Sequence, residues 1–270
     1  MHFKGNLIFF CEYYIWRWRN ICKNDINGYE NENAFVHYFN NKKIFELDPI
    51  SQEFINAIYG NLDSNEEIRC KLNLNKQKAD IIIIINNIKK YISIKKGYKN
   101  SVHTEHVSSF INYLKECGMS NDLARKLLLF HYGDGTDNGS GKVRFSTQEY
   151  ILNHPKDIKE LNSFFNNDGF IIKTVERLII YGNNSKVPID AIIWGVPNDY
   201  MWLTKKEIIN VCLKHKGISK NSLAISGIFY QPFNRCLNFN PKYEKYRHYV
   251  QFKWYHLSDD IIETMAFYRK

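Results

Sequence analysis

The chain has 270 residues and 44% of them are hydrophobic, which is enough to fill the core of one large domain or of a catalytic domain with a smaller companion. This composition excludes a disordered chain. The formal net charge is +9, and the excess is concentrated, because residues 68–100 hold nine Lys or Arg and one acid, and residues 201–270 hold twelve against five. Two basic blocks favour a phosphate backbone as partner; the alternative is solvated lysines without a partner.

The cysteines bear on whether the chain is a zinc protein, and the aromatic start of the chain bears on whether it is a membrane protein. None of the six cysteines has CxxC spacing or a nearby His pair, so a structural zinc site finds no support and reduced thiols of a cytoplasmic protein are expected. The hydrophobic run at residues 7–18 contains Glu12 and Arg17 and falls short of a membrane span. We therefore expect a buried helix or strand there and no membrane association.

The pattern of apolar residues predicts helices and strands along the chain. Helices are expected at residues 49–62, 102–117 and 205–214, the first with Pro49 in its first turn and the second ended by Gly118. Strands are expected at residues 68–74, 79–85, 89–96, 170–181, 189–194, 223–230 and 246–254. This order predicts an α/β or α+β fold, a mixed β-sheet flanked by helices with a β-rich C-terminal extension.

The loop at residues 133–142, GDGTDNGSGK, is the best candidate for a seam between domains. Its glycines and short polar residues favour an exposed, mobile connection. We expect a catalytic core at residues 1–150 and a β-rich region at 151–270 that recognises DNA; one continuous domain is the alternative.

A β-hairpin is predicted around residues 78–96. Five consecutive isoleucines, residues 81–85, would be apolar on both faces of a strand, which predicts a central strand covered on both sides. Asn86 and Asn87 suit the positive φ values of a two-residue turn. That turn would place Asp80 directly opposite Ser93, with Lys95 on the same face.

Such a cluster suits phosphodiester cleavage. A divalent cation stabilises charge on the transition state and lowers the pKa of a water molecule, and carboxylate and carbonyl oxygens are suitable hard ligands for it. Asp80 supplies a carboxylate, and Lys95 can orient the water or stabilise the developing charge. Asp190 also precedes an apolar strand, but no ExK or SxK follows it at hairpin distance, so we interpret it as structural.

These residues resemble the PD-(D/E)xK nuclease superfamily, in the variant where a serine replaces the middle acid and a glutamate on the following helix takes its role. The resemblance covers residues 50–115 and rests on Lys78-Ala-Asp80, Ser93-Ile-Lys95 and Glu105. The proline that normally precedes the first aspartate is absent. The stretch resembles the core of bacterial type II restriction endonucleases.

The resemblance implies a magnesium-dependent endonuclease that cuts double-stranded DNA and leaves 5′-phosphate ends. It implies that Asp80 and Glu105 bind Mg²⁺, that the Ile94 carbonyl completes the coordination, and that Lys95 assists the attacking water. The upstream glutamate of the superfamily would best match Glu53, with Glu46 as the weaker match. A homodimer and a cognate DNA methyltransferase are further partners that the resemblance suggests.

The C-terminal region offers candidates for DNA recognition. Arg235, Arg247, Gln251 and Lys253 are interleaved with aromatic residues, and Arg and Gln can bind guanine and adenine edges through paired hydrogen bonds. Residues 247, 249, 251 and 253 would share one face of a strand. The alternative is a strand whose polar face meets only water.

Two other functions stay open at this point. A repair or recombination nuclease of the same fold would share the catalytic residues without sequence specificity. A noncatalytic nucleic-acid-binding protein would keep the basic blocks and would not depend on Lys95.

Overall fold

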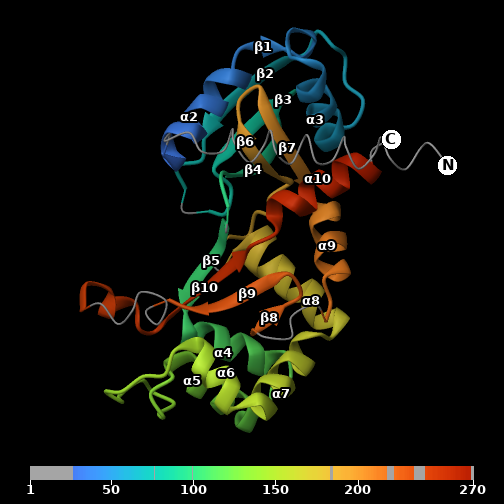
Figure 1. The fold of residues 1–270 in the computed structure, drawn as a ribbon. Helices are drawn as coiled ribbons and strands as arrows, with labels where there is room; N and C mark the ends of the chain where they lie inside the picture. Colours follow the sequence, from blue (N-terminus) through green and yellow to red (C-terminus); the bar gives the residue numbers. More distant parts are fainter. Residues whose placement is uncertain are drawn as a thin grey trace, which may run out of the picture. The chain divides into compact units, whose positions relative to one another are not determined.

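The computed structural model describes residues 27–75, 77–98, 100–182, 185–217, 222–233 and 241–268 (Figure 1). Within these ranges the chain forms two compact units. The first combines the residues up to Asn100 with Ile180–Val211 and those from His256 onward, and the second combines Ser101–Ile179 with Cys212–Tyr255. Residues on both sides of the boundary expected near residue 150 thus belong to the second unit, because each unit is assembled from segments that are distant in sequence.

The first unit is built on a six-stranded mixed sheet with the order β1-β2-β3-β4-β6-β7. Its strands are β1 (Lys42–Lys43), β2 (Glu67–Leu72), β3 (Ile81–Ile85), β4 (Ile88–Lys95), β6 (Ala191–Val196) and β7 (Asp199–Thr204). β4 and β6 pair in parallel, whereas every other neighbouring pair in this sheet is antiparallel. The predicted mixed α/β fold is confirmed.

Helices α2 (Gly28–Phe39) and α3 (Pro49–Tyr59) pack on one face of this sheet. α2 begins with a capping box, in which Asn27 and Glu30 satisfy each other's backbone N–H groups. α3, which was predicted, begins at Pro49 behind the N-cap Asp48. Phe35 and Phe54 of these helices are fully buried, and burial of each such side chain contributes roughly 1.5–3 kcal/mol.

The isoleucine strand β3 lies inside the sheet between β2 and β4, as its composition predicted. Ile81, Ile83 and Ile85 pack in the core beneath α2 and α3, and Ile82 on the other face is also buried. The Asn86-Asn87 turn has φ values of 51° and 64°, and Ile81 pairs with Ile92. The predicted hairpin register is therefore confirmed.

Replacing Asn87 by valine should lower the free energy of unfolding by about 1–2 kcal/mol, because a β-branched residue is strained at positive φ. Asn87→Gly is the matched control and should be as stable as the parent chain or more so, since Asn-Gly is the preferred pair in this turn. Urea unfolding measures both. Equal stability of the valine and glycine variants would contradict the turn geometry.

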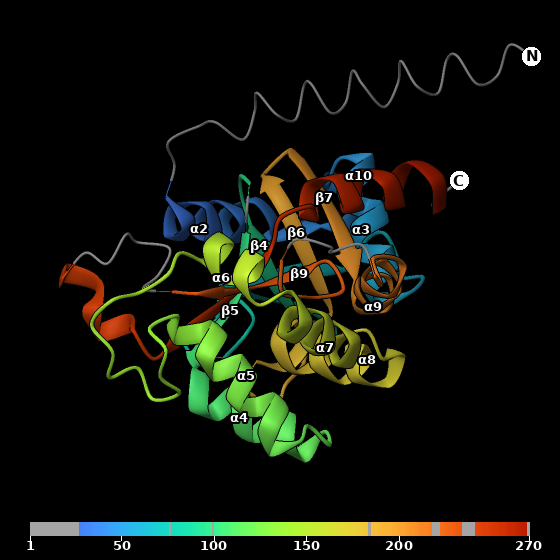
Figure 2. The ribbon, with the colours of Figure 1, turned by 60° about the horizontal axis from the view of Figure 1, so that its bottom comes forward.

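The second unit contains a four-stranded sheet with the order β5-β10-β9-β8. Its strands are β5 (Asn100–His106, in this unit from Ser101), β8 (Ala224–Ile225), β9 (Ile228–Pro232) and β10 (Tyr249–Trp254). Its helices are α4 (Val107–Glu116), α5 (Asn121–Tyr132), α6 (Thr147–Asn153), α7 (Pro155–Phe165) and α8 (Asp168–Val175). α4 and α7 each pack against α5 (Figure 2).

The remaining elements are helices. They are the 3-10 helices η1 (Ile44–Glu46) and η4 (Pro241–Tyr246), the π-helix η2 (Glu176–Tyr181), and the helices α9 (Lys205–Lys214) and α10 (Leu257–Tyr268). α9 matches the helix expected there. None of the helices in the described ranges combines the length and apolar character that a membrane crossing requires.

The helix expected at residues 102–117 is present as α4 but begins later, and one expected strand is wrong in type. Residues 102–106 form the end of β5 instead of a helix, because α4 begins only at Val107 with His106 as its N-cap. The predicted strand at residues 170–181 is helical: Asn167 caps α8, whose buried residues recur at helical spacing. A short apolar run fits a buried helix as well as a buried strand.

Several expectations concern residues that the structure does not describe. The helix or strand at residues 7–18 is one, and Arg235 is another. Of the cysteines, Cys70, Cys117 and Cys212 are free thiols, which agrees with the expectation for these three. Cys11, Cys22 and Cys236 lie outside the described residues.

Candidate active site

Asp80, Ser93 and Lys95 come together at the open end of the β3–β4 hairpin, in the first unit. The backbone N–H of Asp80 donates to the Ile92 carbonyl at 2.8 Å, which extends the hairpin register by one residue. The Asp80 Oδ2 atom accepts hydrogen bonds from Ser93 Oγ at 3.1 Å and from the Ile94 N–H at 2.6 Å. Ser93 is fully buried, so its hydroxyl fixes the orientation of the Asp80 carboxylate from the interior of the protein.

Lys95 lies beside this carboxylate without a close ion pair. Its Nζ atom is 3.8 Å from Asp80 Oδ2 and donates a hydrogen bond of 3.1 Å to the Ile94 carbonyl. The side chains of Asp80 and Lys95 are 25% and 20% exposed, so solvent or a ligand can reach both. The Oδ1 atom of Asp80 accepts no hydrogen bond from the described residues, which leaves an oxygen available to a cation.

A second acid, Glu32 of helix α2, interacts electrostatically with this pair. Glu32 is half-buried, and burial raises its pKa. The negative charge of Asp80 raises this pKa as well, whereas the positive charge of Lys95 lowers it. Asn31, the preceding residue, is buried and donates a hydrogen bond of 2.9 Å to the Gly195 carbonyl at the end of β6, which fixes this turn of α2 against the sheet.

Glu32 was not predicted from the sequence, although a local signal was present. Asn27 followed three residues later by Glu30 is a capping box, and it would have placed the start of a helix ahead of Glu32. The electrostatic interaction of Glu32 with Asp80 could not be predicted, because it depends on the packing of α2 on the sheet.

We call the open end of the β3–β4 hairpin, with Asp80 and Lys95, the hairpin corner. Lys78 is a second lysine at the hairpin corner, next to Lys95 and Asp80 in its electrostatic interactions. Burial lowers its pKa to about 7; the positive charge of Lys95 acts in the same direction and the charge of Asp80 opposes it. The Lys78 side chain passes close to Gly182, where a Cβ would lie 3.5 Å from Lys78 Cδ. The corner thus contains two acids and two lysines whose protonation states influence each other.

Glu105 does not lie on the helix that follows the hairpin, where the resemblance implied it. It lies on strand β5, in the second unit, and is buried with a relative exposure of 4%. Both oxygens of its carboxylate accept hydrogen bonds from the Arg177 guanidinium, one of them at 2.7 Å, and His103 Nε2 lies 3.4 Å away. The carboxylate is already neutralised by a cation of the protein, which indicates a structural ion pair.

The upstream glutamates chosen from the sequence also differ from Glu32, the acid that interacts electrostatically with Asp80. Glu53 is exposed on α3, because that helix turns Phe54 and Ile55 toward the core instead. Glu46 accepts a hydrogen bond of 2.6 Å from the Lys43 N–H and caps η1. Glu32 therefore replaces both as the candidate second acid.

Asp190 has the structural role expected of it. Its carboxylate accepts hydrogen bonds from the Tyr91 N–H at 2.8 Å and from Lys90 Nζ at 3.2 Å. These contacts join β4 to the beginning of β6, its parallel neighbour.

Of the residues proposed for DNA recognition, the structure describes Arg247, Gln251 and Lys253, and Arg247 lies outside the strand that carries the other two. Arg247 precedes β10 and donates to Glu244, to Asp134 at 2.9 Å and to the Gly141 carbonyl at 2.6 Å. This guanidinium holds the loop at residues 133–142 around a buried aspartate, and the loop lies within the second unit, so it is not the connection between the two units. Gln251 and Lys253 are half-exposed on one face of β10, as strand parity predicted.

The hairpin corner offers hard oxygen atoms of the kind that Mg²⁺ prefers. Across the described ranges, no group of three or more His, Cys, Asp or Glu side chains gathers in a way that could hold a metal. Mg²⁺ does not need one, since it keeps several waters and binds through one or two carboxylates. Asp80, Glu32 and the Ile94 carbonyl are such hard oxygen donors.

Comparison with models of known protein families finds no match, and none of the curated proteins compared with the chain matches it.

Proposed function

We propose that this protein is a Mg²⁺-dependent endonuclease that hydrolyses phosphodiester bonds of double-stranded DNA, in the manner of a type II restriction endonuclease. The observation that carries the proposal is the position of the Asp80 carboxylate, which Ser93 Oγ and the Ile94 N–H hold in place, with Lys95 Nζ 3.8 Å from its Oδ2 atom. The negative charges of Asp80 and Glu32 repel each other where burial excludes part of the solvent. A divalent cation bound by both carboxylates would relieve this repulsion.

The proposed cation site consists of Asp80, Glu32 and the Ile94 carbonyl. When bound, Mg²⁺ would supply Lewis-acid stabilisation of the phosphate and a water of lowered pKa. Ser93 and the Ile94 N–H hold the Asp80 carboxylate in a fixed orientation, so little reorganisation is needed when a ligand arrives.

Lys95 is the proposed residue for stabilising charge on the substrate. Its ammonium group is held at 3.1 Å from the Ile94 carbonyl and can donate to a phosphate oxygen or to the attacking water. A lysine at this position contributes a positive charge without blocking the carboxylate, because its distance to Asp80 Oδ2 is 3.8 Å.

The wider setting of the proposal follows from the resemblance alone. It comprises action in the cytoplasm against foreign DNA, a homodimer, and a companion methyltransferase. A repair nuclease of the same fold would use the same corner, and the digestion pattern separates the two.

The proposal is tested by incubating the pure protein with plasmid and phage DNA, methylated and unmethylated, in Mg²⁺ or in EDTA. We expect discrete fragments in Mg²⁺ and none in EDTA. A smear would favour the repair nuclease, and intact DNA under every condition would refute both.

Removing the carboxylate of Glu32 should raise the Mg²⁺ concentration needed for half-maximal cleavage by at least about tenfold, because loss of a ligand weakens the cation site. The test compares Glu32→Gln with Glu53→Gln in a Mg²⁺ titration of the cleavage rate. Glu53→Gln is the matched control, since Glu53 is exposed on α3 and should leave the titration unchanged. If the Glu53 variant shifts and the Glu32 variant does not, the sequence-based choice is right and the structural one is wrong.

A further inference from the structure

A group of aromatic rings gathers at one end of the sheet of the second unit, where β5 and β9 end and β10 begins. The ring cluster, as we call it, consists of His106, Phe233, Tyr246, Tyr249 and His248. Ring centroids lie 5.5 Å apart between His106 and Tyr249, 6.1 Å between Tyr246 and Tyr249, and 4.8 Å between Phe233 and Tyr246. His106 also stacks on His248 at 5.6 Å with an interplanar angle of 24°.

The ring cluster does not belong to the hydrophobic core. Along β10 the side chains of Val250, Phe252 and Trp254 are fully buried on one face, whereas Tyr249 on the other face is 36% exposed. His106 is exposed as well. Phe233, Tyr246 and His248 are half-buried, so each keeps part of its surface in contact with water. An aromatic face that stays in contact with water is available to another planar group.

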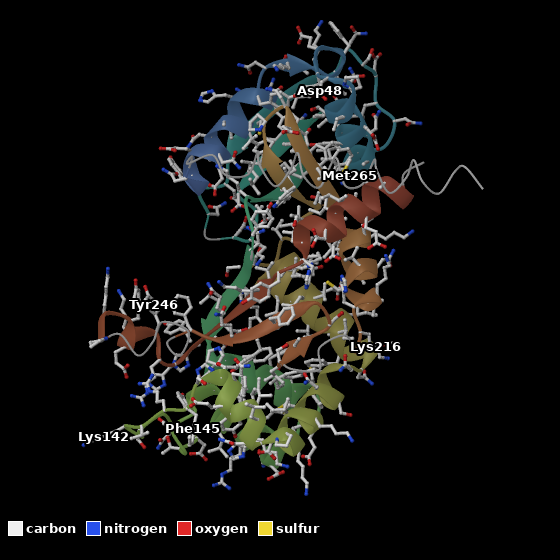
Figure 3. All side chains as sticks on the ribbon, viewed as in Figure 1. Asp48, Lys142, Phe145, Lys216, Tyr246 and Met265 are labelled. Carbon is white, nitrogen blue, oxygen red and sulfur yellow. The ribbon has the colours of Figure 1, made fainter. Side chains whose placement is uncertain are left out.

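Positive charge lies directly beside these rings. Lys245 Nζ is 5.0 Å from the centroid of the Tyr246 ring (labelled in Figure 3), and Lys242 Nζ is 5.7 Å from that of Tyr243. Glu244 is the one acid in the sequence of η4, and it is already paired with Arg144 at 3.0 Å and with Arg247 at 2.7 Å. Its charge is thus compensated by the arginines, and the lysines of η4 leave a net positive charge beside the rings.

Aromatic rings next to lysines suit a single-stranded nucleic acid. Each unpaired base can stack on a ring, and each phosphate between bases can meet an ammonium group. A duplex hides its base faces in the stack and offers only backbone and groove edges. Exposed rings therefore favour unpaired bases over a duplex.

We propose that the ring cluster binds unpaired bases of DNA, stacking them on Tyr246 and Tyr249 while Lys245 contacts a neighbouring phosphate. The inference rests on the proposed function for the identity of the polymer, and it adds that the protein holds a locally single-stranded stretch of its substrate.

The test measures fluorescence anisotropy of a labelled 20-nucleotide oligo(dT) and of a labelled 20-base-pair duplex in EDTA, so that cleavage plays no part. We expect tighter binding of the single strand. Tyr246→Ala or Tyr249→Ala should weaken that binding by about tenfold, since one stacked base contributes on that scale, while the Tyr→Phe changes at the same positions keep it. Tyr29→Ala is the matched control, because it removes a tyrosine ring that is 63% exposed in the first unit.

A second measurement does not depend on removing a ring. Lys245→Ala should reduce the slope of log Kobs against log salt concentration by about 0.7 for the single strand, as expected for one lost phosphate contact. Thermal melting of each variant identifies any that fail to fold. If a ring variant does not fold, the salt dependence of Lys245→Ala and the affinity of the wild-type protein for single strand against duplex test the inference.

The inference is overturned if the duplex binds as tightly as the single strand, if neither oligomer binds, or if both ring variants and the lysine variant bind like Tyr29→Ala. These results are distinct from failure of the proposed function. A protein that cuts duplex DNA in Mg²⁺ but does not prefer single strands refutes the ring cluster alone. One that binds single strands through the rings and cuts no DNA refutes the nuclease alone.

Discussion

Replacing Asp80 by asparagine should reduce Mg²⁺-dependent DNA cleavage by at least about 10³-fold, because charge stabilisation worth several kcal/mol is lost with the carboxylate. Asparagine has nearly the same shape and keeps an oxygen that can accept from Ser93 Oγ and the Ile94 N–H. The fold should therefore be retained while the charge that attracts the cation disappears. Single-turnover cleavage of plasmid DNA measures the effect.

Two comparisons make this experiment specific. Asp122→Asn removes a 74% exposed carboxylate from α5 and should cleave at the parental rate. Lys95→Ala should also lose about 10²- to 10⁴-fold, as expected for a positioned proton-transfer or charge-stabilising group. If Asp80→Asn cleaves DNA like Asp122→Asn, the hairpin corner is not the active site.

Replacing Glu105 by alanine should lower the free energy of unfolding by about 3–5 kcal/mol, since it leaves the guanidinium of Arg177 partly buried without its partner. The carboxylate is 1% exposed and the Arg177 side chain 18%, so solvent compensates little of the loss. The guanidinium also lies 4.6 Å from the centroid of the Tyr113 ring, which holds it in place. Urea unfolding measures the change, with Glu116→Ala, at an exposed position of α4, as control.

The same ion pair predicts a dependence on pH. Burial alone would raise the pKa of Glu105, but the hydrogen bonds and charges of Arg177 and His103 outweigh it and lower this pKa to about 2, from an ordinary value of 4.5. A depressed pKa stabilises the folded state above the unfolded value, and this stabilisation is lost as the pH falls from about 4.5 toward 2. The stability difference between the parent chain and Glu105→Gln should therefore narrow across that range. A difference independent of pH would contradict the ionised pair.

Glu105 also separates the structural interpretation from the one implied by the resemblance. If it were a magnesium ligand, Glu105→Gln would abolish cleavage with little change in stability. From its pairing with Arg177 we expect the reverse, a destabilised variant that still cleaves DNA at temperatures where it is folded.

The sequence by itself determined the hairpin and with it half of the candidate site. Five isoleucines require burial on both faces, and Asn86-Asn87 accept positive φ, so a two-residue turn fixes the register and brings Asp80 opposite Ser93. Helix α3 was predictable for a similar reason, because Pro49 and the apolar stripe lie within a few residues of each other. These are local interactions, whose geometry follows from the order of residues.

Only the tertiary structure decided which acid joins Asp80 and what Glu105 does. The charge of Glu32 acts on Asp80 because the aromatic side of α2 packs on the sheet. Glu105 is paired because the helical turn at residues 176–181 brings Arg177 to β5. The same holds for residues 170–181, whose apolar run suits a strand or a buried helix equally until its neighbours are known. Contacts between residues far apart in the chain depend on how whole elements pack, and the pattern within each element does not contain that information.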